Sequence, residues 1–129
     1  MDIKEWAKRY ANAWEDADAD AAGALFSEEA TYQSQPFQEP HRGREGVRLY
    51  WREVTARQAN VEVSIGRTMM VGSRAVVEWW TQMESDGAPV TLPGALLLDF
   101  DADGLCCALR EYWNVEVGRR VPPPPGWGT

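Results

Sequence analysis

The stretch QPFQEPHRGRE, Gln35–Glu45, separates two predicted helices and a short strand from a third helix and the strands that follow it. Pro36 and Pro40 each remove a backbone donor and fix φ, so the stretch predicts a loop rather than a regular element. Gly43 ends the loop and begins a helix. The residues just before the loop, Ala30–Ser34, predict a short strand that leads into it.

On both sides of this loop, apolar residues recur at three- and four-residue spacing, which indicates amphipathic helices. The first helix is predicted over Asp2–Asp16. A shorter second helix follows, with Asp18 or Asp20 as its N-cap and an end near Ser27. The third helix begins at Gly43.

Beyond the third helix the period of the apolar residues changes to two. Strands are predicted at Val61–Ile65, Ala75–Met83, Val90–Phe100 and Leu105–Val117, joined by glycine-containing turns. Helices followed by a meander predict a single α+β domain over residues 1–120. In it, three N-terminal helices cover one face of a curved antiparallel sheet.

The composition limits the partners of the protein. The 129 residues carry a net charge of −7 without a cluster of Lys or Arg, which argues against nucleic acid and against an anionic membrane surface. The longest apolar run, Ala95–Leu98, is far shorter than the roughly 20 residues of a membrane helix, and no signal-peptide core is visible. We therefore expect a cytoplasmic protein. With only Cys106, Cys107 and His41 as soft ligands, we expect no metal and no cofactor.

The strand Ala75–Met83 is apolar on both faces. Because an exposed Trp80 would contribute to a large apolar patch, we expect a homodimer formed through this face of the sheet. The proline-rich tail, residues 121–129, is predicted to be a frayed end with polyproline character. A docked Trp127 is the alternative.

Several short motifs together resemble a ketosteroid isomerase over residues 5 to about 117, nearly the whole chain. These enzymes belong to the nuclear transport factor two-like superfamily, which also contains the SnoaL-like polyketide cyclases. The motifs are Arg9-Tyr10, Ala24-Leu25-Phe26 with Ala30-Thr31, Pro36-Phe37, Glu39-Pro40, Gly43-Arg44-Glu45, Phe100-Asp101 with Gly104, and Tyr112-Trp113.

The resemblance implies a cone-shaped domain, a cystatin-like α+β barrel, whose interior holds a flat apolar ligand. By position, the strands would contribute inward-facing residues that also obey the two-residue alternation. These are Trp79, Thr81, Met83, Leu92, Gly94, Leu96, Leu109, Glu111 and Trp113. The helical side would contribute Trp14, Phe26, Tyr32, Phe37, Tyr50 and Trp51.

The isomerase mechanism that the resemblance implies uses three groups: an Asp as the base, and a Tyr and a protonated Asp that stabilise the enolate oxygen. Tyr10 matches the tyrosine. The base position falls on Ser34 or Gln35, and the position of the protonated Asp falls on Leu96. Because losing a positioned base costs about 10²–10⁴ in rate, we do not expect the family reaction by the family mechanism.

Glu111 offers a replacement acid. In the inward-facing register its carboxyl group would enter an apolar cavity, where loss of solvation raises its pKa. A structural alternative is an ion pair with Arg110 or Arg74. For Tyr10 the alternative is a buried helix tyrosine without a ligand. His41 is either a solvated loop residue or a ligand contact.

Three functions remain open from the sequence. The first is an isomerase, cyclase or lyase that acts by general acid/base chemistry, with Glu111 as base and Tyr10 as hydrogen-bond donor. Its ligand would be small and largely apolar, and a polycyclic molecule is one example. The second is a non-catalytic binding or carrier module with the same pocket. The third is a dimerisation module with a filled cone.

Overall fold

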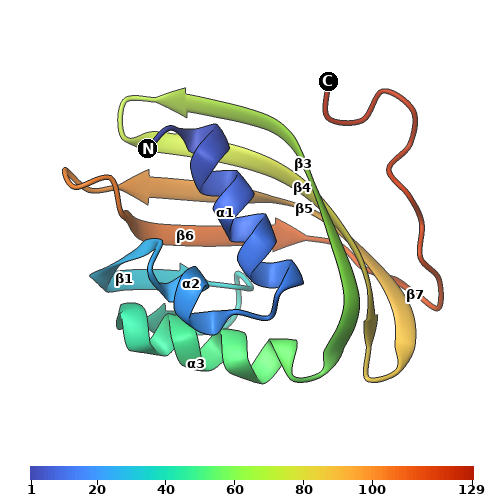
Figure 1. The fold of residues 1–129 in the computed structure, drawn as a ribbon. Coiled ribbons are helices and arrows are strands. Elements are labelled where there is room, and N and C mark those ends of the chain that lie inside the picture. The colour runs from blue at the N-terminus through green and yellow to red at the C-terminus, as the bar shows by residue number, and fades with distance from the viewer.

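A strongly curved sheet wraps around three helices in the computed structural model, which describes residues 1–129 (Figure 1). The helices are α1 (Ile3–Glu15), α2 (Ala19–Gly23) and α3 (Gly43–Thr55). The strands are β1 (Phe26–Gln33), β2 (His41–Arg42), β3 (Gln58–Val71), β4 (Arg74–Ser85), β5 (Ala88–Phe100), β6 (Cys106–Trp113) and β7 (Glu116–Val117). The predicted α+β class with a curved, mainly antiparallel sheet is confirmed.

The sheet order is β2-β1-β6-β5-β4-β3, and β7 pairs with β5. Strands β3 to β6 form the predicted antiparallel meander, whereas β1 joins β6 in parallel, with Tyr32 opposite Leu109. This pairing brings the segment before the proline-rich loop next to the last long strand. Residues from the two ends of the sequence therefore meet inside the curve of the sheet.

Helix α1 packs its apolar stripe into the curve of the sheet. The Asp2 side chain caps the helix by accepting a hydrogen bond from the Glu5 N–H at 2.8 Å. The buried face carries Trp6, Tyr10 and Trp14. Because these residues are spaced by four, their rings lie one above another along the helix. The predicted helix is confirmed.

One end of the cone is filled by aromatic side chains. Trp6 contacts Phe26 and Phe100 edge to face, with ring centroids 5.9 and 5.7 Å apart. Leu96 and Leu109 belong to the same hydrophobic core and are almost completely buried. Such a core supplies most of the hydrophobic free energy of folding, since each fully buried large side chain contributes about 1.5–3 kcal/mol.

Several element boundaries differ from the prediction. The first strand begins at Phe26 rather than Ala30, and the predicted strand Leu105–Val117 is two strands, β6 and β7. The second helix ends at Gly23 rather than near Ser27, because Phe26 already pairs with Cys106 in the sheet. The strand after the third helix, β3, runs over Gln58–Val71 and is much longer than the predicted Val61–Ile65. Its register shifts between Ile65 and Thr68, and this irregularity interrupts the two-residue period that marks a strand in the sequence.

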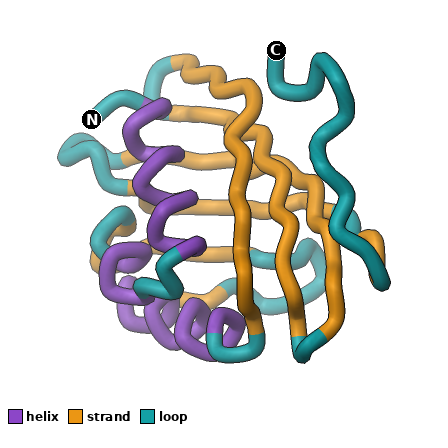
Figure 2. Tube along the Cα trace, turned by 45° about the vertical axis from the view of Figure 1, so that its right-hand side comes forward, coloured by secondary structure: helices purple, strands orange, loops and turns teal.

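The tail is docked, so the prediction of a frayed end is wrong. The chain returns alongside the strands after β7 (Figure 2). The Trp80 indole donates a hydrogen bond to the Val121 carbonyl at 2.8 Å, and Trp127 packs edge to face on the Trp80 ring at 5.8 Å. Gly66 makes room for this contact, because a Cβ there would lie 3.0 Å from the Trp127 ring.

The docked tail changes the argument for a dimer. Trp80 is covered by its own chain, so it does not form the exposed patch on which the dimer prediction was based. On the same outer face a groove of about 600 Å³ stays open over Val76, Leu97 and Ala108. The homodimer therefore remains a prediction, now centred on this groove. None of the helices combines the length and apolar composition required to cross a membrane.

Candidate functional site

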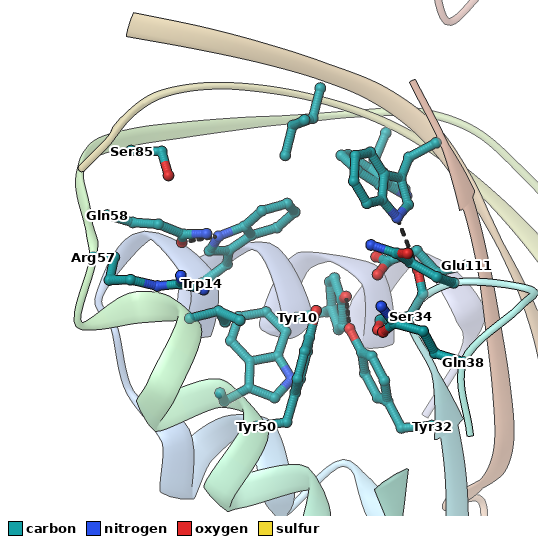
Figure 3. A pocket seen from close by; sticks show the side chains of 16 residues that line it. Tyr10, Trp14, Tyr32, Ser34, Gln38, Tyr50, Arg57, Gln58, Ser85 and Glu111 are labelled. Carbon is teal, nitrogen blue, oxygen red and sulfur yellow. Dashed lines mark hydrogen bonds between the residues drawn. The ribbon is translucent and has the colours of Figure 1, made fainter. Parts of the chain in front are cut away.

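A cavity of about 370 Å³ lies at the open end of the cone, between α1, α3 and the inner face of the sheet (Figure 3). Its wall combines aromatic side chains with polar ones. The aromatic wall consists of Tyr10, Trp14, Tyr32, Tyr50, Trp51, Trp79 and Trp113, and Leu92 and Val54 add aliphatic surface. The polar residues are Ser34, Gln35, Gln38, Arg57, Gln58, Ser85 and Glu111.

Most of the predicted lining residues meet at this cavity, but seven do not, among them Gly94, where a Cβ would lie 2.5 Å from the Trp79 ring. Phe26, Thr81, Met83, Leu96 and Leu109 are buried in the protein without lining it. They face inward as predicted, but neighbouring side chains cover them, so they do not reach the cavity surface. Phe37 is fully exposed in the proline-rich loop, so its predicted place in the wall is wrong.

Three lining residues on and after α3 were missed by the sequence analysis. Val54 follows Tyr50 by four residues on the same face of α3, whereas Arg57 and Gln58 lie beyond the helix end at Thr55, with Gln58 as the first residue of β3. The apolar stripe of α3 could have located Val54, but it ends before Arg57 and Gln58. The contributions of Gln38 and Ser85 come from loop geometry and strand ends, for which the sequence carries no periodic signal.

Glu111 lies on β6 and its side chain points into the cavity (Figure 3). It is only 7% exposed, and burial among apolar groups raises the pKa of its carboxyl group to about 8. The predicted alternative of an ion pair is excluded. Arg74 pairs with Asp99 at 3.3 Å, and Arg110 is exposed because adjacent strand residues point to opposite faces.

Glu111 lies close to the two positions at which the isomerase pattern has acids and this sequence has none. Leu96, at the position of the protonated Asp, is the direct cross-strand partner of Glu111. Directly paired residues present their side chains on the same face of a sheet. Ser34 and Gln35, at the position of the base, both line the cavity. A carboxyl group is thus present one strand away from where the isomerase pattern has one.

Two tyrosine hydroxyls meet beside this acid. The hydroxyl oxygens of Tyr10 and Tyr32 are 2.8 Å apart and completely buried. Burial, followed by the nearby charge of Glu111, raises the pKa of both hydroxyls well above the usual value, so both stay neutral. A pair of hydroxyls has two protons and uses one in the mutual contact. The other proton is available for a ligand oxygen.

The indole N–H groups in the wall fall into two sets. Trp14 donates to the Gln58 side chain and Trp113 donates to the Ser34 carbonyl, both at 2.8 Å. The buried N–H groups of Trp51 and Trp79 have no partner. His41 lies outside the cavity and packs on Tyr50, with ring centroids 4.4 Å apart. Its effect on the site is therefore through the placement of that tyrosine.

The fold and the cavity together define a cone-shaped protein of the ketosteroid isomerase-like class. Residues 7–109 match the family model of the SnoaL-like domain, and the chain belongs to this family. Comparison with curated protein sequences gives no match.

Three solved structures are similar to the chain. A hypothetical protein with a ketosteroid isomerase-like fold from Catenulispora acidiphila, solved in complex with trimethylamine, has 25% identity and a TM-score of 0.76 over 84% of each chain. The epoxide hydrolase/cyclase-like enzyme SalBIII, described for pyran ring formation in the polyether salinomycin, has 20% identity and a TM-score of 0.76 over 88% of this chain and 94% of its own. An LEH-like epoxide hydrolase of M. tuberculosis has 21% identity and a TM-score of 0.72 over 85% of this chain and 80% of its own.

Proposed function

We propose that the cavity binds a small, largely apolar organic molecule and performs general acid/base chemistry on it. The observation that carries this proposal is Glu111, a buried carboxyl group in an aromatic cavity with no protein partner and beside the Tyr10–Tyr32 hydroxyl pair. A group with a pKa of about 8 changes its protonation state close to neutral pH, which is the property required of a general acid or base.

The two kinds of group divide the chemistry between them. With Tyr32 donating to Tyr10, the Tyr10 proton is directed at a ligand oxygen and stabilises negative charge that develops there. Glu111 as a carboxylate takes a proton from the ligand, and in its neutral form returns one. Proton transfer next to a carbonyl group is the simplest reaction that uses both residues. An isomerase, cyclase or lyase can be built on this step.

The SnoaL-like family fits such a role, and so do the cyclase- and hydrolase-like names of two structural neighbours. A second candidate function is non-catalytic binding or transport of the same kind of molecule. It is supported by the absence of acids at Ser34, Gln35 and Leu96, and by the relative that was solved with trimethylamine. The two candidates share the cavity and differ in the role of Glu111.

Deuterium exchange of a simple ketone separates these candidates. We choose 2-tetralone as the probe, because a fused aromatic ketone suits an aromatic cavity of about 370 Å³. Binding is followed by quenching of tryptophan fluorescence, and exchange of the protons next to the carbonyl is followed by NMR in D₂O. The step breaks a C–H bond, forms an O–H bond on Glu111 and places negative charge on the ketone oxygen near Tyr10.

We expect Glu111→Gln to bind 2-tetralone but to lose about 10²–10⁴ in exchange rate. Tyr10→Phe should lose about 10²–10³. Because the carboxylate is the base, the wild-type rate should rise with pH and level off above about pH 8. Glu53→Gln removes an exposed charge from α3 and serves as the matched control without an effect.

Two results would change the proposal. Exchange at the wild-type rate in Glu111→Gln would remove Glu111 from the mechanism. Binding of the ketone without any catalysed exchange would leave the carrier function as the better description.

We also propose that the chain forms a homodimer through the outer groove over Val76, Leu97 and Ala108, where apolar side chains lie without cover from the tail.

A further inference from the structure

Several aromatic rings surround one small space in the cavity wall. Trp14 and Trp79 are in contact edge to face at 5.3 Å, and Trp14 and Trp51 at 5.8 Å. Tyr50 and Trp113 extend the wall toward β6. The face of an aromatic ring carries negative charge in its quadrupole, and several rings around one space attract a positive charge, with tryptophan the best ring for this.

An acidic side chain without a counter-charge, Glu111, lines the same space. None of the ion pairs in the structure includes Glu111. The cationic side chain that lines the cavity, Arg57, lies across it from Glu111 (Figure 3). A buried carboxyl group is normally paired with a cation or with hydrogen-bond donors, because an isolated buried charge is costly. Here the protein supplies neither.

We propose that the ligand of this cavity carries an alkylated ammonium group, which Glu111 pairs with while the tryptophan and tyrosine rings surround its alkyl substituents. This inference deepens the proposed function, since it rests on the cavity being a ligand site and names the class of ligand. An alkylammonium ion is still a largely apolar molecule. Its single charge is the feature that the aromatic wall and the acid share.

The remaining ionisable groups around Glu111 do not compete for this role. Tyr10 on α1, Tyr32 on β1 and Tyr50 on α3 all have pKa values raised by burial, so they stay neutral. Strands β4 and β5 contribute no ionisable side chain to the cavity. Arg57 is exposed at the far side and leaves the Glu111 end free for a cation.

The first test compares two probes of the same shape. Choline and 3,3-dimethylbutan-1-ol differ in one atom, nitrogen in place of carbon, and therefore in charge. Binding to the wild-type protein is measured by tryptophan fluorescence and calorimetry at pH 8. We expect choline to bind at least about tenfold more tightly than the neutral alcohol. In Glu111→Gln this preference should fall strongly, whereas in Glu53→Gln, which loses the same charge on the surface, it should persist.

A second readout follows the proton. Because Glu111 has a pKa of about 8, it is mostly protonated at pH 7, and pairing with a cation expels about 0.9 proton. Calorimetry in two buffers of different ionisation enthalpy measures this release. The affinity for choline should also improve about tenfold between pH 7 and pH 9 and then level off, while the affinity for the alcohol stays constant. Glu111→Gln should release no proton.

Equal or tighter binding of the neutral alcohol overturns the inference, and so does an absence of choline binding. Choline binding that keeps its preference in Glu111→Gln overturns it as well, because the acid would then have no part in recognition. These outcomes do not decide the proposed acid/base function, because exchange of 2-tetralone tests that function independently with an uncharged molecule. Conversely, a preference for choline without ketone exchange supports the ligand class and favours the carrier.

Discussion

Replacing Glu111 by Gln should stabilise the protein, and by more at high pH than at low pH. Burial raises the pKa of the Glu111 carboxyl group from 4.5 to about 8 in the folded state. Between these values the folded state holds a proton that the unfolded state has lost, so stability falls as pH rises through this range. Each pKa unit corresponds to 1.36 kcal/mol. The wild type therefore loses about 3 kcal/mol by pH 7 and about 5 kcal/mol by pH 9.

Gln has the shape of the protonated acid and no ionisation to lose. The free energy of unfolding of Glu111→Gln should exceed that of the wild type by about 1 kcal/mol at pH 5, about 3 at pH 7 and about 5 at pH 9. For a chain of this size the difference at pH 7 corresponds to a melting temperature higher by about 10 °C. Urea unfolding followed by circular dichroism at the three pH values gives the comparison.

The difference between the two proteins isolates Glu111, because all other groups titrate in both. Glu53→Gln is the control and should show no pH-dependent difference from the wild type. A difference between wild type and Glu111→Gln that is the same at pH 5 and pH 9 would refute the argument. It would mean that the carboxyl group ionises in contact with water or another partner and is not desolvated in the cavity.

Three other changes test the architecture. A Cβ on Gly94 would lie 2.5 Å from the Trp79 ring, so Gly94→Ala should cost about 1–3 kcal/mol and weaken binding of 2-tetralone, measured by urea unfolding and fluorescence titration. Trp127→Ala should release the tail from Trp80, seen as faster proteolysis of the tail and a red shift of tryptophan emission, while far-UV circular dichroism stays unchanged. Leu97→Asp should convert the proposed dimer to a monomer in sedimentation experiments; a wild-type protein that sediments as a monomer contradicts the dimer.

The fold could be predicted because its main elements have strong periodic signals. The stripe of α1 and the alternation in β4 and β5 are local properties of the sequence, and each follows from burial on one face. The signal failed where geometry is not periodic. The irregularity between Ile65 and Thr68 hid the length of β3, and the parallel pairing of β1 with β6 joins segments that are distant in the sequence.

The docked tail depends on a contact that no local pattern describes. Trp127 packs on Trp80 because Gly66, on a third segment, leaves space for the ring. Proline-rich composition alone is typical of an unpacked end, and so it led to the wrong expectation. The contact joins three parts of the chain that only the folded structure brings together.

The site residues on the strands could be predicted from the sequence, whereas the residue assigned to the proline-rich loop could not. The direction of Glu111 follows from strict alternation along β6, so a correct register was enough to place it in the cavity. Phe37 was assigned by resemblance to a position in a loop, where no alternation fixes the side chain, and it is fully exposed. Access to the cavity was also not predictable, because Leu96 faces inward but is covered by other side chains and does not line the cavity.

The distribution of unpaired polar groups connects stability with function in this protein. The indole groups of Trp51 and Trp79 are buried without hydrogen-bond partners, and the carboxyl group of Glu111 is buried without a counter-charge. Each unpaired group costs the fold about 1–3 kcal/mol, and all three residues line the same cavity. Folding alone gains nothing from this arrangement, whereas a bound molecule that pairs with the acid recovers part of the cost as affinity. Outside the cavity, Arg48 Nε and the Thr81 hydroxyl are also buried without a hydrogen-bond partner, so the cavity is one of the places where the chain gives up stability, as expected of a site that binds a ligand.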